Sequence, residues 1–319
     1  MAHQLEKTNG RASMFFVGEL PWHGLGQELR GRPTVREAIT ASGLDWEVEL
    51  MPLVTGDAHE PAPARAVRRT TDRRLLGVVG PAYQALQNSS AFSWFDPFLD
   101  AGLAALHTGG SLCDGRKVWL LARIEREPLV IGDGDEIQKF VMLSNSHDGT
   151  TSVRVGFTPI RVVCANTLAL AHADKAGSRL IRVRHTRRLA DNLDALREVM
   201  DLADREFTAT AEQYRQLRDK GINQNDLARY VRQVFRIESK QLNGQQRRII
   251  ESCFRLFEEG RGADLPGVRG TLWGAYNAVT EYLAYERGKG QDTRLASLWF
   301  GESARTNHRA LETALAMAV

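Results

Sequence analysis

The hydrophobic and polar positions of this chain change their period part-way along it. Up to about His185 the apolar residues follow the patterns of strands separated by turns. Lys117 to Ile124 predicts a buried strand that contains Trp119. Leu129 to Leu143, interrupted by Gly132-Asp133-Gly134, carries the clearest hairpin signal in the chain. We therefore expect a sheet in this first part.

Further strands and three helices are expected in the same part of the chain. The turn residues Thr71-Asp72 predict a hairpin that leads into Val78-Val79. Alternating side chains predict strands from Ser152 to Phe157 and from Leu180 to Thr186. Helical segments are expected at Thr34 to Ser42, Ser90 to Ala101 and Thr167 to Ala173.

After Arg188 the apolar residues recur at alternating steps of four and three, from Leu189 to Leu217. This spacing contains no glycine or proline, and it predicts one helix of about eight turns with a coiled-coil-like seam. Shorter helices are expected to follow. Their predicted starts are positions that suit helix N-termini: Asn223, Asn243, Thr271, Asp292 and Ser303.

These patterns predict an α+β protein with two domains. Residues 1–188 are expected to form a mixed, largely antiparallel sheet domain with packed helices. Residues 189–319 are expected to form a helical domain led by the long helix. A chain of 319 residues can bury one large core or two smaller ones.

The composition indicates an ordinary soluble globular protein, with 43% hydrophobic and 25% charged residues. The first ten residues hold no apolar stretch, and no later apolar run is long enough to span a bilayer, so we expect neither a signal peptide nor a membrane segment. Cys113, Cys164 and Cys253 are odd in number and far apart, which favours a reducing compartment and predicts no zinc site. We expect a cytoplasmic protein without metal or cofactor.

The charge is segregated in one block, although the whole chain is nearly balanced at +3. Between Gly149 and Ala190 there is one acidic residue, Asp174, where the chain's average predicts about five. Such a block suits a polyanion such as nucleic acid, and the alternative is a run of solvated arginines. The block contains eight basic residues: Arg154, Arg161, Lys175, Arg179, Arg182, Arg184, Arg187 and Arg188.

Arg161 differs from the other basic residues because its neighbours are apolar. An unpaired buried arginine is costly, so either an internal carboxylate pairs with it or it faces an anionic ligand. Asn166 and Thr167 are placed to cap the helix expected after them. Backbone N–H groups at that helix N-terminus, close to Arg161, would favour phosphate binding.

Two polar motifs are candidates for a further site. His23, in Pro21 to Gly26, is a possible acid or base, or a residue that caps a carbonyl in a turn. His147 and Asp148 suggest a base and its orienting carboxylate, but neighbours on a strand point to opposite faces, and Asp148-Gly149 is an ordinary turn pair. No phosphate-binding glycine loop of the P-loop type is present.

Several of these strings together resemble the phage/plasmid-like protein family built on the domain of unknown function 932 (DUF932). In order they are Asn9 to Ala12, Pro21 to Gly26, Leu76 to Gly80, Ser146 to Gly149, Arg161 to Thr167, Arg184 to Thr186, Gly270 to Ala278, Glu281-Tyr282 and Trp299 to Gly301. The resemblance implies a protein of a phage, prophage or plasmid in a bacterial host cell. It assigns no reaction and therefore no catalytic residue.

A looser, architectural resemblance is to the single-strand annealing proteins of phage and recombination systems, which form rings and hold single-stranded DNA by its backbone. We therefore expect a non-enzymatic DNA-binding protein whose partner is single-stranded DNA. Tyr83, Phe140 and Phe157 are either base-stacking or core residues. The alternatives are an enzyme acting on nucleic acid or nucleotides, with His23, His147 and Asp148 in its site, and a scaffold that forms homo-oligomers through the long helix.

Overall fold

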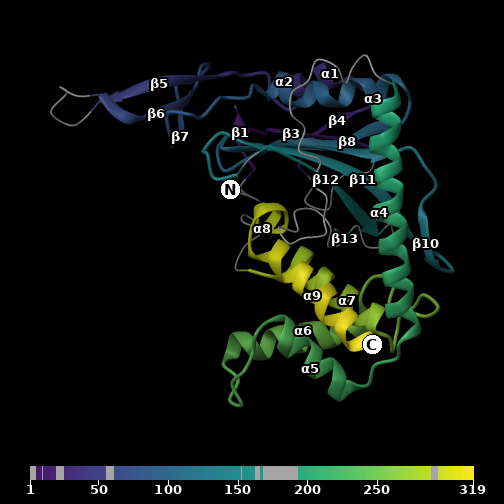
Figure 1. Ribbon diagram of the computed structural model, residues 1–319. Coiled ribbons are helices and arrows are strands. Elements are labelled where there is room, and N and C mark those ends of the chain that lie inside the picture. Colours follow the sequence, from purple (N-terminus) through teal and green to yellow (C-terminus); the bar gives the residue numbers. More distant parts are fainter. Residues whose placement is uncertain are drawn as a thin grey trace. The chain divides into compact units, whose positions relative to one another are not determined.

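The computed structural model describes residues 5–8, 10–18, 25–54, 61–151, 153–161, 166–167, 193–288 and 294–319 (Figure 1). A mixed sheet region with helices precedes a helical C-terminal region, which confirms the α+β class. The chain forms two compact units. Unit 1 comprises Met1–Glu125, Val141–Gly156 and Leu180–Leu196, and unit 2 comprises Arg126–Phe140, Phe157–Arg179 and Arg197–Val319. This division is interleaved along the chain, whereas the sequence suggested one boundary near residue 188.

The largest sheet has the strand order β13-β12-β11-β9-β8-β3-β4, and β10 pairs with β11. β3 and β4 pair in parallel, while the pairs β3–β8, β8–β9, β10–β11 and β12–β13 are antiparallel, so the sheet is mixed as expected. The strands are β3 (Met14–Val17), β4 (Gln27–Leu29), β8 (Ala104–Leu112), β9 (Lys117–Ile124), β10 (Leu129–Gly132), β11 (Asp135–Ser146), β12 (Arg154–Arg161) and β13 (Asn166–Thr167).

Three short helices of unit 1 lie along one face of this sheet: α1 (Val35–Ala41), α2 (Asn88–Phe92) and α3 (Asp96–Asp100) (Figure 1). Thr34 caps α1 in a capping box with Glu37, as the predicted helix requires. The single helix expected from Ser90 to Ala101 is instead α2, a 3₁₀ turn and α3. Pro97 provides the reason, because it has no N–H with which to continue the hydrogen bonds of a single helix.

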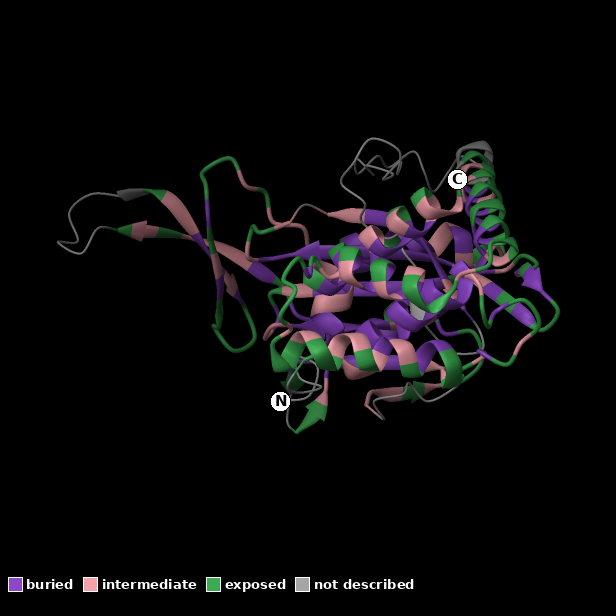
Figure 2. Ribbon diagram, turned by 90° about the horizontal axis from the view of Figure 1, so that it is seen from below, coloured by how far each residue is buried: buried purple, intermediate pink, exposed green. Residues whose placement is uncertain are grey.

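A separate three-stranded sheet of unit 1 consists of β5 (Val48–Val54), β6 (Pro61–Arg69) and β7 (Leu75–Val79). The hairpin between β6 and β7 turns at Thr71-Asp72, as predicted. Most of its described side chains are exposed or half-buried, in contrast to the buried strands of the large sheet (Figure 2). The short strands β1 (Lys7–Thr8) and β2 (Arg11–Ala12) also pair with each other.

Unit 2 contains most of the helices. These are α4 (Leu193–Asp219), α5 (Gln224–Val234), α6 (Gly244–Glu259), α7 (Leu272–Glu281), a π-helical turn (Tyr282–Glu286), α8 (Arg294–Phe300) and α9 (Glu302–Ala318). Asn223, Asn243 and Thr271 cap α5, α6 and α7 with their side chains, which confirms three predicted starts. α9 begins after Gly301 rather than at Ser303, and Asp292 lies outside the described residues.

The apolar seam of α4 is core from residue 200 to residue 217, where Met200, Phe207, Tyr214 and Leu217 are at most 3% exposed. The ring of Phe207 lies 5.8 Å from that of Phe157, and Tyr214 lies 4.8 Å from Trp273. These contacts lie within unit 2, so this part of the seam packs against its own chain. The positions before Leu193 are outside the described residues. None of the described helices is long and apolar enough to cross a membrane.

Candidate functional site

Only two of the eight predicted phosphate-binding residues lie in the described part of the chain. Arg154 is half-buried at the start of β12, and Arg161 ends the same strand. The other predicted members lie outside it: Lys175, Arg179, Arg182, Arg184, Arg187 and Arg188. His23 and the predicted strand at 180–186 also lie outside the described residues. Of the predicted helix at 167–173, Thr167 alone is described.

Arg161 is buried and paired with a carboxylate. Its Nε and Nη2 donate to the two carboxylate oxygens of Asp135, at 2.7 and 2.8 Å, and neither side chain is more than 1% exposed. Nη1 and Nη2 also donate to the carbonyls of Arg261 and Gly262, each at 3.3 Å. Of the two alternatives for Arg161, an internal carboxylate or an anionic ligand, the structure contains the internal carboxylate. The prediction that Arg161 contacts a phosphate is wrong, because no part of the guanidinium reaches the surface.

Asp135 also joins Arg161 to the helical part of unit 2. Trp273, in the first turn of α7, donates from Nε1 to Asp135 Oδ2 at 2.7 Å, and the Arg161 guanidinium lies 5.6 Å from the Trp273 ring centroid. A buried ion pair stabilises a fold only when its remaining donors and acceptors are satisfied. Here three groups of unit 2 bond to the pair, the carbonyls of Arg261 and Gly262 and the indole N–H of Trp273, which indicates a structural role.

Asn166 and Thr167 are extended. They form β13 and pair with Arg161 and Ile160 of β12. The rest of the helix predicted from Thr167 to Ala173 lies outside the described residues, so the predicted phosphate site at its N-terminus stays a prediction.

His147 follows β11 and is fully buried in unit 1. Its Nε2 lies 2.9 Å from Asn88 Oδ1, and the Asn88 amide nitrogen donates to the Leu44 carbonyl at 3.0 Å. Because Oδ1 must then be the acceptor, Nε2 carries the proton. Burial lowers the pKa of His147 to about 4. The ring also makes an edge contact with Trp46, at 5.1 Å between centroids.

Asp148 binds its own loop rather than the imidazole. It accepts a short hydrogen bond from Ser146 Oγ, and Thr150 donates to it from its backbone N and Oγ1 at 2.9 and 2.6 Å. Burial raises the pKa of Asp148, but the hydrogen bonds from Ser146 and Thr150 outweigh this effect and hold the pKa below its usual range. His147 and Asp148 therefore hold two different parts of the fold and are not arranged as a base with its orienter.

The three aromatic residues considered for base stacking are also used by the fold. Phe140 and Phe157 are buried. Tyr83 is half-buried, and its hydroxyl donates to the Ser146 carbonyl at 3.2 Å. We therefore assign them to packing.

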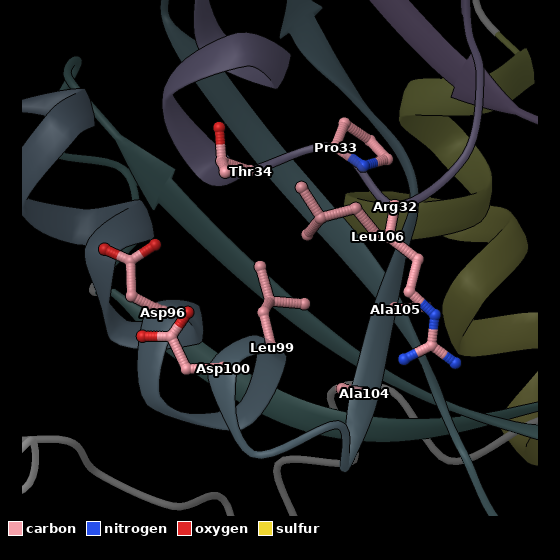
Figure 3. Close-up of a pocket in the computed structure, with 9 residues that line it drawn as sticks. All are labelled: Arg32, Pro33, Thr34, Asp96, Leu99, Asp100, Ala104, Ala105 and Leu106. Atoms are coloured by element: carbon pink, nitrogen blue, oxygen red, sulfur yellow. The ribbon is translucent and has the colours of Figure 1, made fainter.

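One small pocket lies between α3, β8 and the loop before α1, and sequence reasoning missed it (Figure 3). Its volume is about 120 Å³, well below the ~300–1,000 Å³ of ordinary ligand sites. Asp96 and Asp100 line one side, and burial together with the charge of Asp100 raises the pKa of Asp96. Arg32 lies on another side but donates to Glu125 at 3.0 Å. The spacing of four between the two aspartates was the available sequence signal.

No group of three or more side chains suited to hold a metal ion occurs among the residues that the structure describes. The described polar motif, His147 and Asp148, bonds to residues of its own unit.

A family comparison supplies the identification. The model of the family "Domain of unknown function (DUF932)" matches residues 75–314, about three quarters of the chain. The chain belongs to the DUF932 family. In this DUF932 protein the match extends from β7 into α9, and it includes His147 with its partner Asn88 and the Arg161–Asp135 pair. The comparisons with curated proteins and with solved structures give no match.

Proposed function

We propose that this DUF932 protein is a non-enzymatic DNA-binding protein of a phage, prophage or plasmid, and that it mediates single-strand annealing or recombination. The observation that carries the proposal is the acid-poor block from Gly149 to Ala190. It has one acidic residue and eight basic ones, and Arg161 is the one of the eight that pairs with Asp135.

The hydrogen bonds of the polar motif in unit 1 support a binding protein over an enzyme. The enzyme alternative needs His147 and Asp148 to meet a substrate. His147 is fully buried, and the carboxylate of Asp148 is occupied by Ser146 and Thr150. Neither side chain is arranged to exchange a proton with a bound nucleotide.

The first experiment measures binding of a fluorescein-labelled oligo(dT) by anisotropy between ~50 and ~200 mM salt. Each phosphate that a basic residue neutralises releases counterions, so the logarithm of the association constant should fall linearly with the logarithm of the salt concentration. No binding at ~50 mM salt would contradict the proposal. Hydrolysis of the oligonucleotide with Mg²⁺, Mn²⁺ or Zn²⁺ would favour the enzyme alternative.

A pair of variants tests the block itself. The double variant Arg182→Glu, Arg184→Glu should reduce the slope of log association constant against log salt by at least ~1.4 for single strands. Each lost phosphate contact accounts for ~0.7 of this change. The matched control is Arg30→Glu with Arg36→Glu, which changes the net charge equally at two exposed positions of unit 1. If both double variants bind alike, the block does not form the contact surface.

This proposal includes a homo-oligomer, because the annealing proteins that the chain resembles form rings. Light scattering of the purified protein, with and without oligo(dT), measures its mass. A monomer under both conditions would contradict annealing by a ring. DNA binding would then still be tested by the salt titration.

A further inference from the structure

We propose that the hairpin of α5, α6 and their connecting loop is a second surface that binds the phosphodiester backbone of nucleic acid. This inference rests on the proposed function, but it concerns a different segment from the block at 149–190. Residues 227–250 hold one acidic residue, Glu238. They hold six basic residues: Arg229, Arg232, Arg236, Lys240, Arg247 and Arg248.

Two of these six residues are already used within unit 2. Arg229 pairs with Asp226 at 2.9 Å, and Arg232 donates to the Ser239 carbonyl at 2.6 Å. The other four, which we name the α5–α6 cations, are exposed and pair with no carboxylate among the described residues: Arg236, Lys240, Arg247 and Arg248.

Three other exposed arginines of the same unit have carboxylate partners. Arg305 pairs with Glu302 at 2.9 Å, Arg269 lies 3.8 Å from Glu258, and Arg255 makes a close pair with Glu286. Solvation alone gives no reason for charge to be balanced on these helices and unbalanced at the α5–α6 hairpin. A polyanion that binds at the hairpin would balance it.

The fold brings the α5–α6 cations to one end of the hairpin. α5 and α6 lie side by side, with the loop joining them at that end (Figure 1). Arg236 directly follows the α5 C-cap, Phe235, and Lys240 lies in the loop. Arg247 and Arg248 are the fourth and fifth residues of α6, within ~8 Å of its start along the axis.

The positive charge at this end is only partly balanced, because the connecting loop holds one acidic residue, Glu238, among the cations. The first turn of α6 contains no acidic residue, and cations close to a helix N-terminus are unfavourably placed in the field of the helix. Burial and then the nearby charge of Arg236 lower the pKa of Arg309, while the charge of Glu302 acts in the opposite direction. Phosphate groups would reverse this repulsion.

The cations are separate from the groups that hold the hairpin in place. The inner face of α5 is buried, and Tyr230 of that face donates from its hydroxyl to the Ala310 carbonyl at 3.0 Å. The segment also presents no free aromatic face, because Tyr230 is buried and Phe235 packs against Tyr282. We therefore expect contacts to phosphates only, without base preference and with both single and double strands.

The test is a fourfold neutralisation: Arg236→Gln, Lys240→Gln, Arg247→Gln and Arg248→Gln. The matched control neutralises four arginines of unit 2 that have carboxylate partners: Arg229→Gln, Arg255→Gln, Arg269→Gln and Arg305→Gln. Both variants lose four positive charges, so a difference between them reports position and not net charge. Salt titrations use oligo(dT) and a duplex of equal length.

The slope is that of the logarithm of the association constant against the logarithm of the salt concentration. Loss of the α5–α6 cations should reduce its magnitude by ~3 for the single strand and by ~4 for the duplex. The control should change it by less than ~1. Equal effects of the two variants would overturn the inference. If the wild-type protein binds and the Arg182, Arg184 variant is weakened while the fourfold variant is not, the inference alone fails. If the wild-type protein binds neither DNA, the proposed function fails.

A footprint on the wild-type protein keeps the test valid if the fourfold variant does not fold. Acetylation of lysines is measured by mass spectrometry with and without oligo(dT). Lys240 should be protected several-fold, and the exposed Lys220 of the same unit should react equally in both samples. Unprotected Lys240 in a saturated complex would overturn the inference.

Discussion

At the scale of single residues, the buried pair of Arg161 and Asp135 shows how one side chain can organise a unit. Asp135 accepts hydrogen bonds from Arg161 and from Trp273, so one carboxylate connects two strands of the sheet to α7. Removing one partner of such a pair leaves an uncompensated charge in the interior, which costs far more than the pair itself contributes.

Asp135→Ala is therefore expected to destabilise the protein by about 3–5 kcal/mol. Urea unfolding followed by tryptophan fluorescence measures the change. The control is Asp133→Ala in the same hairpin turn, where the side chain is exposed and the expected change stays within about 0.5 kcal/mol. Equal unfolding midpoints for the two variants would show that Arg161 finds another partner.

At the scale of elements, α4 combines a periodic sequence with a buried seam. The four-three spacing predicts a helix here. Contacts with Phe157 and Trp273 determine where its apolar seam packs. The oligomeric scaffold alternative needs this seam at the surface. From residue 200 to residue 217 it is not available.

Phe207→Ala should cost about 3–5 kcal/mol, because Phe207 is fully buried and its removal leaves a cavity. Thermal melting measures the loss. Thr208→Ala, one position along and exposed, should leave the melting temperature nearly unchanged. If Phe207→Ala melts like the wild type but has a smaller mass by light scattering, the seam is an interface between chains.

At the scale of the whole molecule, we expect the two units to differ in their response to acid. Burial lowers the pKa of His147 to about 4, and burial followed by the charge of Arg123 does the same for His107. Both histidines belong to unit 1. Between pH ~6.5 and ~4 the unfolded chain binds protons that the folded unit does not, so stability falls as the pH falls through this window.

We expect each histidine to contribute a slope of up to ~1.4 kcal/mol per pH unit in that window. Hydrogen exchange, corrected for the intrinsic rate at each pH, should show β8 and β9 losing protection before α7 and α9. His147→Gln should reduce the slope by about half. Simultaneous loss of protection in both units at pH ~5 would contradict this difference.

The sequence by itself determined the local structure and the fold class. Turn residues specified the hairpins at Thr71-Asp72 and Gly132 to Gly134, because few backbone conformations reverse a chain so tightly. Polar side chains specified the starts of helices at Asn223 and Asn243, because they bond to N–H groups only three residues away. Each of these signals lies within a few residues of the structure it predicts.

The roles of the charged and polar side chains were decided only by the tertiary structure. Arg161 lies 26 positions from Asp135, and Asp135 lies 138 positions from Trp273. His147 lies 59 positions from its amide partner, Asn88. The sequence offered two alternatives for Arg161 and an adjacent but incorrect partner for His147. Whether a cation meets a buried carboxylate or solvent depends on which distant elements pack around it, and no local pattern records that packing.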